Sequence, residues 1–358
     1  MAKFDISFIM PVYNTDDGLL TAAINSVLAQ KANFELIIID DGSSQHTADY
    51  LDTFMQLDNR IKVLHDENQG VSKARNHALN IVQGEYIAFI DADDQYIPAF
   101  AEIALPIARE KNLDALFGRW CYRDLDLIEG RDSYSKRIIY MDSDNSDYFK
   151  ASIFDKTVME NLNISSFGFT CCYGILFCTK SLENIRFKEN IRISEDSLFI
   201  WDFLSQNKSI AFLDDVVYIR ERSDNSATRS TRINALEELT DTSMILRDLA
   251  DKSNDFLKRS LYKSIFWHFC CISDYTICRK DFYSKIGGSK TQYMRKIIQT
   301  PVFKEAFKHP EAVTDNQKII CNLALKGYAL PLVIIMTQSQ RLYRIQFALK
   351  KKFCTKHQ

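Results

Sequence analysis

The sequence lacks the marks of several protein classes. Its 45 Lys and Arg against 47 Asp and Glu give a formal net charge of −2 over 358 residues, so it has no basic excess of the kind that nucleic-acid-binding proteins normally show. Its nine cysteines form no Cys-x-x-Cys pair, which argues against a zinc framework and predicts reduced thiols in a cytoplasmic protein. We expect no secretory signal peptide, because the first residues enter a strand pattern at once.

A long apolar run is missing as well. The apolar stretch from Ala329 to Met336 is far shorter than the roughly 20 residues that a membrane-spanning helix needs. The hydrophobic fraction of 46% is nevertheless ample for a large buried core. These features predict a soluble enzyme larger than one average domain, in the cytoplasm or peripheral at the inner face of the cell membrane.

Three carboxylates follow one short apolar strand. The strand Tyr86 to Ile90 leads directly into Asp91, Asp93 and Asp94. Clustered acids at the end of a buried strand repel one another and lose hydration unless a cation or hydrogen-bond donors neutralise them. An Asp-x-Asp pair here suits a hard divalent ion held together with ligand phosphates. An isolated pair of this kind is more typical of a plain acidic turn, so other motifs must decide.

The first forty residues predict a strand–helix–strand unit. Asp5 to Val12 and Glu35 to Ile39 are unbroken apolar runs, and Leu19 to Gln30 between them carries apolar residues at helical spacing. This pattern indicates a right-handed βαβ unit with a parallel sheet, whose ligands bind at the carboxyl ends of the strands. Tyr13 and Asp41 lie at such ends, so we expect a stacking face for a base and an acceptor for a pyrimidine N–H beside the acid cluster.

Four motifs in order carry a family resemblance. They are Pro11 to Asn14, Ile38 to Ser43, Asn68 to Asn76 and Gly84 to Asp94. Together they resemble the nucleotide-binding half of the family 2 inverting glycosyltransferases with the GT-A fold. A phosphatase-like aspartyl nucleophile is an alternative for Asp40-Asp41-Gly42-Ser43 alone, but it needs a distant Lys and leaves the other three motifs unexplained.

The resemblance implies a fold, domains and ligands. We expect an α/β, Rossmann-like GT-A domain over residues 1–232, with residues 1–95 as its nucleotide-binding half and 96–232 as its acceptor half, and a helical region over 233–358. Mn²⁺ or Mg²⁺ would bind Asp93 and Asp91. The implied donor-binding residues are Pro11, Val12, Tyr13, Asp41, Arg75, Asp91, Ala92, Arg220, Arg222 and Ser226.

A second acidic pair precedes an apolar helix pattern. Ser194, Glu195 and Asp196 stand before Leu198 to Leu204. One interpretation is a helix N-terminus, where Ser194 or Glu195 caps the helix and the carboxylates favour its positive end. The resemblance implies instead that Asp196 is the base that takes the proton of the acceptor hydroxyl and that Glu195 orients the acceptor.

Two further segments are polar. We read Asp124 to Asp147 as an irregular loop. Arg220 to Arg229 resembles a stretch that folds over the donor diphosphate in relatives, with Arg222 where a metal-binding His is often found. That departure puts a third protein ligand for the metal in doubt, although Arg222 could neutralise the diphosphate directly. A basic loop with no ordered contacts is the alternative.

The C-terminal third has helical spacing and a basic end. His268 lies within an apolar stripe, which favours a packed core histidine. No Asp or Glu follows Asp315, whereas eight Lys and Arg do, so the preceding residues sum to −10 (−2 − 8). The side chains of Leu342, Ile345, Leu349 and Phe353 would share one helical face. This tail suits either an anionic membrane surface or docking on the acidic catalytic half.

We therefore predict a metal-dependent inverting glycosyltransferase, a hexosyl- or N-acetylhexosaminyltransferase. Its donor would be a nucleotide-diphosphate sugar, with a UDP-sugar favoured, and its acceptor a hydroxyl of a growing capsule, lipopolysaccharide or related surface glycan, free or lipid-linked. The alternative is a catalytically weak, membrane-associated partner that binds nucleotide sugar or glycan in an assembly complex. A homo-oligomer is compatible with the aromatic-rich helices, and no nucleic-acid partner is expected.

Overall fold

The computed structural model describes residues 2–123, 137–155, 157–159, 170–206, 208–221 and 232–354, with side chains up to 341. The chain divides into two compact units. Unit 1 comprises Met1–Ile153 and Met159–Arg222, and unit 2 comprises Phe154–Val158 and Ser223–Gln358. Each unit is described by itself below.

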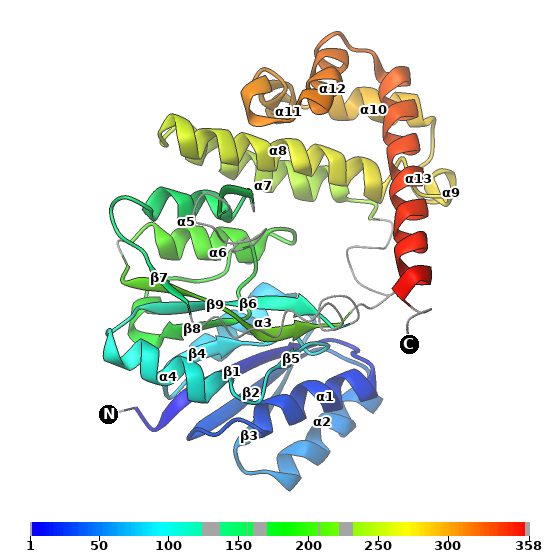
Figure 1. Ribbon diagram of the computed structural model, residues 1–358. Helices are drawn as coiled ribbons and strands as arrows, with labels where there is room; N and C mark the ends of the chain where they lie inside the picture. The colour runs from blue at the N-terminus through cyan, green and yellow to red at the C-terminus, as the bar shows by residue number, and fades with distance from the viewer. Residues whose placement is uncertain are drawn as a thin grey trace. The chain divides into compact units, whose positions relative to one another are not determined.

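Unit 1 is built on one mixed sheet (Figure 1). Its described residues form nine strands in the order β3-β2-β1-β4-β8-β6-β9-β5, with β7 also paired to β9. The parallel part consists of β1 (Phe4–Val12), β2 (Phe34–Asp41), β3 (Ile61–Asp66) and β4 (Gly84–Phe89). The remaining strands are β5 (Gln95–Tyr96), β6 (Ala115–Tyr122), β7 (Ile138–Tyr140), β8 (Ile175–Cys178) and β9 (Ile210–Arg220).

Helices cover both faces of this sheet. They are α1 (Asp17–Leu28), α2 (Gln45–Leu57), α3 (Val71–Leu79), α4 (Phe100–Glu110), α5 (Ser146–Ser152) and α6 (Glu195–Leu204), with a 3₁₀ turn at Thr179–Leu182. On one face Phe8 packs with Leu20 of α1 and Phe100 of α4. On the other face Phe89 meets Phe199 of α6.

The expected α/β architecture is confirmed. The apolar run of β2 is buried at every position, as a parallel strand covered on both faces requires. The predicted helix Leu19 to Gln30 is α1, which begins earlier because Asp16 caps it by accepting hydrogen bonds from the Gly18 and Leu19 amides.

The predicted loop Asp124 to Asp147 is partly wrong. Residues 124–136 lie outside the described part of the chain, but β7 and the start of α5 fall within the rest. The strand forms because Ile138 to Tyr140 pairs antiparallel with β9. Asp142 then accepts hydrogen bonds from the Asp144 and Asn145 amides and turns the chain into α5. Three apolar residues among many acids are too short a pattern to predict a strand from the sequence.

Unit 2 is helical, as expected. Its helices are α7 (Ala235–Ala250), α8 (Asp255–Tyr275), α9 (Phe282–Lys285), α10 (Lys290–Gln299), α11 (Pro301–Ala306), α12 (Asp315–Leu325) and α13 (Ala329–Cys354), with a 3₁₀ turn at Pro310–Ala312. No helix in the described part of the chain is both long and apolar enough to cross a membrane.

The expected core histidine of unit 2 is confirmed. His268 is fully buried, and its Nδ1 lies 2.8 Å from the Ser243 hydroxyl of α7. Burial lowers the pKa of His268 to about 3, so the ring is neutral at physiological pH and fixes the pairing of α7 with α8.

Candidate active site

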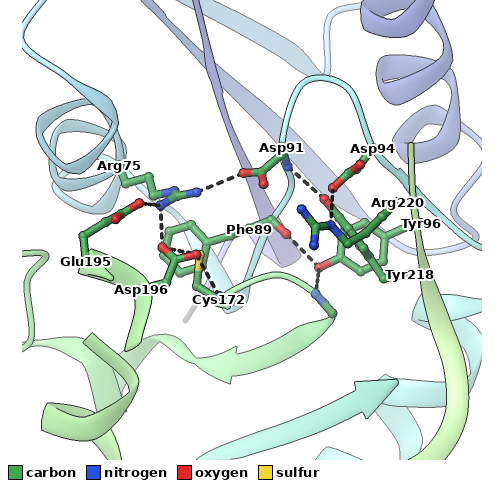
Figure 2. Close-up of polar contacts among 11 residues, drawn as sticks. Arg75, Phe89, Asp91, Asp94, Tyr96, Cys172, Glu195, Asp196, Tyr218 and Arg220 are labelled. Atoms are coloured by element: carbon green, nitrogen blue, oxygen red, sulfur yellow. Dashed lines mark hydrogen bonds and ion pairs between the residues drawn. The ribbon is translucent and has the colours of Figure 1, made fainter. Parts of the chain in front are cut away.

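The site is built at the carboxyl ends of β1, β2 and β4, the edge of a parallel sheet at which ligands bind. Two tyrosine hydroxyls, from β9 and β5, hold the end of β4 and the chain immediately after it. The Asp91 amide donates a hydrogen bond to the Tyr218 hydroxyl of β9 at 3.0 Å. The Tyr96 hydroxyl donates to the Phe89 carbonyl at 2.9 Å. These contacts fix the main chain that carries the acid cluster (Figure 2).

A single guanidinium joins this cluster to the second acidic pair (Figure 2). Arg75 of α3 donates from Nη2 to Asp91 Oδ1 at 2.9 Å and from Nη1 to Asp196 Oδ1 at 2.6 Å. Glu195 Oε1 lies 3.7 Å from the same Nη1. The Arg75 side chain is only 4% exposed, and its guanidinium lies over the Phe187 ring.

Electrostatic attraction keeps the Arg75 guanidinium and its carboxylate partners together. Burial alone would lower the pKa of Arg75, but the nearby Asp196, Cys172 and Asp91 raise it well above its ordinary value. The guanidinium therefore stays protonated. Its Nε is buried and has no hydrogen-bond partner among the described residues, so one donor of the guanidinium stays unsatisfied.

The second acidic pair begins α6 in a strained turn. Ser194 is at the N-cap position with φ +66°, which confirms a helix N-terminus here, but its side chain makes no cap hydrogen bond. A left-handed conformation is costly for a residue with a β-carbon. It turns Glu195 and Asp196 toward Arg75.

Asp196 is held from two sides. Besides Arg75, the Cys172 amide donates to its Oδ2 at 3.4 Å and the Cys172 thiol to its Oδ1 at 3.5 Å. Burial raises the pKa of Asp196, Arg75 opposes this and Asp91 adds to it, with a net rise. Burial and the Asp196 charge raise the pKa of Glu195 to about 7. A carboxylate pair with raised pKa values has the chemistry of a general base.

The acid cluster after β4 has an excess of negative charge. Asp94 is 2% exposed, accepts a hydrogen bond from the Glu221 amide at 2.9 Å and lies 3.8 Å from Arg220 Nε. Burial, Asp91 and Asp93 raise the pKa of Asp94 to about 8. Burial and Asp91 raise that of Asp93. Asp94 is not among the metal ligands or donor-binding residues predicted from the sequence, and its position as the third acid after the strand is the signal that points to it.

The donor set suits a divalent cation only in part. Within the described ranges no three His, Cys, Asp or Glu side chains are arranged as a metal site. Asp91 and Asp93 supply carboxylate oxygens next to uncompensated charge, which fits an ion that takes its other ligands from phosphate and water. Asp91 is at the same time the partner of Arg75.

The turn between β3 and α3 is ordered by a carboxylate. Both Asp41 oxygens accept main-chain hydrogen bonds, from the Gln69 amide at 2.7 Å and the Gly70 amide at 2.9 Å. Asp41 therefore shapes the turn before α3. This structural role is separate from its predicted role as a hydrogen-bond acceptor for a pyrimidine N–H. Gly42 has φ +72°, and a β-carbon there would lie 2.5 Å from the Asn68 nitrogen, so only glycine fits.

The other expected donor residues differ in accessibility. The Tyr13 side chain is 57% exposed, as a free stacking face would be. Pro11 is half-buried, whereas Val12 and Ala92 are buried, so these last two could meet a donor only through their main chain. Arg222 and Ser226 lie outside the described residues.

Three aromatic rings surround Arg220, an arrangement that the sequence did not predict. Its guanidinium lies 5.2–5.3 Å from the ring centroids of Trp120, Tyr122 and Tyr173, and its Nη1 is 3.3 Å from the Tyr122 hydroxyl. These rings come from β6 and the segment before β8. Among the described residues Arg220 contacts Asp94 of the cluster and does not join the group around Arg75.

Comparison with known proteins identifies the family. Residues 7–182 match the family model described as Glycosyl transferase family 2. This segment belongs to that family. The chain is 29% identical to glycosyltransferase GlyG of Streptococcus pneumoniae over 237 residues, which are 63% of this chain and 73% of GlyG. It is 31% identical over 226 residues to an uncharacterised glycosyltransferase of Rickettsia bellii, covering 62% of this chain but only 29% of that protein.

The fold resembles that of a solved structure. S. aureus TarS, residues 1–349, superposes with a TM-score of 0.63 at 18% identity, covering 94% of this chain and 91% of that one. The likeness confirms the GT-A fold with a helical C-terminal region.

The Arg75 group gives a first prediction. Arg75→Gln should lower the free energy of unfolding by about 3–5 kcal/mol, because it leaves buried carboxylates without their cation. Adding Asp196→Asn should restore part of that loss, which a double-mutant cycle in urea would measure. Matched single substitutions at the exposed pair Arg247 and Asp248 should cost little and add independently. Additive losses at Arg75 and Asp196 would contradict the coupling.

Asp94 gives a second prediction, on pH. Its pKa of about 8 in the folded protein, against 3.8 ordinarily, means that the unfolded chain loses this proton first, so the site loses stability as pH rises between these values. Asp94→Asn keeps an oxygen for the Glu221 amide and does not titrate. In chelator it should match the wild type near pH 4 and exceed its stability by on the order of 2 kcal/mol near pH 8. A difference in melting temperature that does not vary with pH would contradict this assignment.

Proposed function

We propose that this glycosyltransferase moves a hexosyl or N-acetylhexosaminyl group from a UDP-sugar, with inversion, to a hydroxyl of a growing surface glycan. The observation that carries the proposal is the bridge from Asp91 to Asp196 through Arg75. This bridge places Asp91, which we assign to the phosphate side, and Asp196, the candidate base, on opposite sides of the Arg75 guanidinium. A donor sugar bound beside this bridge would have its diphosphate near Asp91 and its anomeric carbon near Asp196.

The chemical step needs one base. The acceptor hydroxyl gives its proton to Asp196 while its oxygen bonds to the anomeric carbon, and the bond to the diphosphate breaks with the electron pair leaving on the phosphate oxygen. The raised pKa of Asp196 supports this role, because a base works best when its pKa approaches the working pH. Glu195 shares the site and orients the acceptor. Arg75 holds Asp196 in place and, through its contact with Asp91, also stands on the side where the diphosphate would bind.

Mn²⁺ or Mg²⁺ is the proposed ion at the acid cluster, which supplies only part of its ligands. Asp91 and Asp93 would hold the ion together with diphosphate oxygens, and the ion would stabilise charge on the departing diphosphate. The raised pKa values of Asp93 and Asp94 support this, since burial and then the neighbouring carboxylates disfavour their ionised forms, which a cation would stabilise. Arg220 stands at the same cluster through Asp94.

Relatives support the choice of substrates. TarS has been crystallised with UDP and with UDP-GlcNAc, and the exposed Tyr13 ring offers a face for a uracil. GgaB of Bacillus subtilis, named a minor teichoic acid biosynthesis protein, is 28% identical over 235 residues, which are 24% of GgaB. We propose by analogy that the acceptor is a glycan or lipid-linked glycan of a capsule, lipopolysaccharide or teichoic-acid type, met in the cytoplasm.

The metal assignment gives a third prediction. Asp93→Ala should abolish Mn²⁺-stimulated hydrolysis of UDP-sugars and weaken Mn²⁺ binding in calorimetry, because the ion loses a charged ligand. The exposed Asp49→Ala is the matched control and should behave as wild type. Full activity of the Asp93 variant, or of the wild type in excess chelator, would overturn the site.

The base gives a fourth prediction. Asp196→Asn should keep donor affinity but lower the rate of transfer by about 10²-fold or more, the range of a positioned base. Asp202→Asn is the control, because Asp202 lies on the same helix α6 but pairs with Lys188. Loss of donor affinity with unchanged transfer would place Asp196 on the donor side instead.

A further inference from the structure

The turn between α12 and α13 is a defined structural motif. The Tyr328 amide donates to the Leu323 carbonyl at 2.9 Å and the Gly327 amide to the Ala324 carbonyl at 3.0 Å. Gly327 has φ +75°. This is a Schellman ending of α12, in which glycine takes the left-handed position. The two helices are thus joined by a short turn, Lys326 to Tyr328, that presents its side chains in a fixed way.

Large apolar side chains gather on this helical hairpin. Of the fourteen strongly exposed large apolar residues in the described part of the chain, five lie within residues 319–334. They are Ile319 (57% exposed), Leu325 (42%), Tyr328 (53%), Leu330 (57%) and Ile334 (48%). Scattered exposed apolar residues are normal, but such a concentration marks an interaction surface.

Helix α13 shows that these exposed apolar residues are not the ones that pack it within unit 2. Leu332 and Met336, one turn apart, are buried and supply the stripe that holds α13 in unit 2. Leu330 and Ile334 form a second pair at the same spacing and stay exposed. A helix that needed only to pack in unit 2 would carry polar residues there.

The charge of the same segment has one sign. After Asp315, which pairs with Lys318, no acidic residue follows, while Lys326 lies in the turn and Arg341 is exposed on α13. The helix continues to Cys354, and its sequence adds Arg344 and Lys350, Lys351 and Lys352. Unbalanced basic charge next to exposed Leu, Ile and Tyr is the composition of a segment that lies at an anionic membrane interface.

We propose that the α12–α13 hairpin is a docking surface for an anionic lipid bilayer. Leu325, Tyr328, Leu330 and Ile334 would enter the headgroup boundary, with the Tyr328 hydroxyl at the wet level that tyrosines favour, and Lys326 and Arg341 would meet the phosphates. A second copy of this chain fits less well, because the same basic charges would face each other across a symmetric interface. The inference concerns residues outside the candidate active site, so it stands or fails independently of the proposed function.

The test uses the full-length protein and vesicles of phosphatidylcholine with or without phosphatidylglycerol. The wild type should sediment with the anionic vesicles, less so as salt rises, and poorly with the neutral ones. The double variant Leu330→Ser/Ile334→Ser should lower the apparent affinity by about 10-fold or more, because two apolar anchors are lost. The variant Lys326→Ser/Arg341→Ser should lower it by a smaller factor that vanishes at high salt.

Two controls make the result specific. Met55→Ser/Leu57→Ser removes exposed apolar side chains from α2 of unit 1 and should leave vesicle binding unchanged. Circular dichroism and donor hydrolysis should be unchanged in every variant, which separates a docking defect from unfolding or from failure of the active site. A wild type that never sediments with anionic vesicles would overturn the proposal. So would equal losses in the hairpin and control variants, or a hairpin variant that alters the oligomeric state by light scattering without altering vesicle binding.

Discussion

The candidate active site depends on one buried cation. Arg75 projects from α3 and ties the end of β4 to the start of α6, joining Asp91 to Asp196, which lies 121 positions from Arg75 in the sequence. Buried like charges repel strongly in a medium of low polarity, and the guanidinium offsets this repulsion among the carboxylates. The left-handed Ser194 and the hydrogen bonds from Cys172 adjust Asp196 around a position that Arg75 sets.

The acid cluster shows what the fold leaves uncompensated. Arg75 neutralises Asp91 and Asp196, but Asp93 and Asp94 stay near one another with raised pKa values. Arg220 approaches Asp94 only to 3.8 Å and is itself held by aromatic rings. The protein thus keeps a local deficit of positive charge at the end of β4. Such a deficit costs stability in the free protein and favours the arrival of a cation with its phosphate ligand, the trade between stability and function common at active sites.

Much of this could be predicted from the sequence, for physical reasons. Buried parallel strands read as apolar runs, and the topology of a parallel sheet brings Tyr13, Asp41 and Asp91 to one edge. Contacts between segments that are far apart in the chain leave no local sequence pattern from which they could be predicted. Nothing in the sequence joins Arg75 to Asp196, or surrounds Arg220 with Trp120, Tyr122 and Tyr173, because these meetings arise from the packing of α3 and β6 against later elements. The short strand β7 escaped notice since pairing with β9, rather than its own three residues, forms it.

The stereochemistry of transfer tests the central claim most directly. A base at Asp196 facing a diphosphate held near Asp91 implies a single displacement at the anomeric carbon. After a panel of nucleotide sugars has identified the donor by release of its nucleotide, nuclear magnetic resonance of the early product reads its anomeric configuration before mutarotation or further transfer. The account predicts inversion relative to the donor sugar. Retention would contradict it, because retention requires a second displacement or a front-face route in which Asp196 does not act as the sole base.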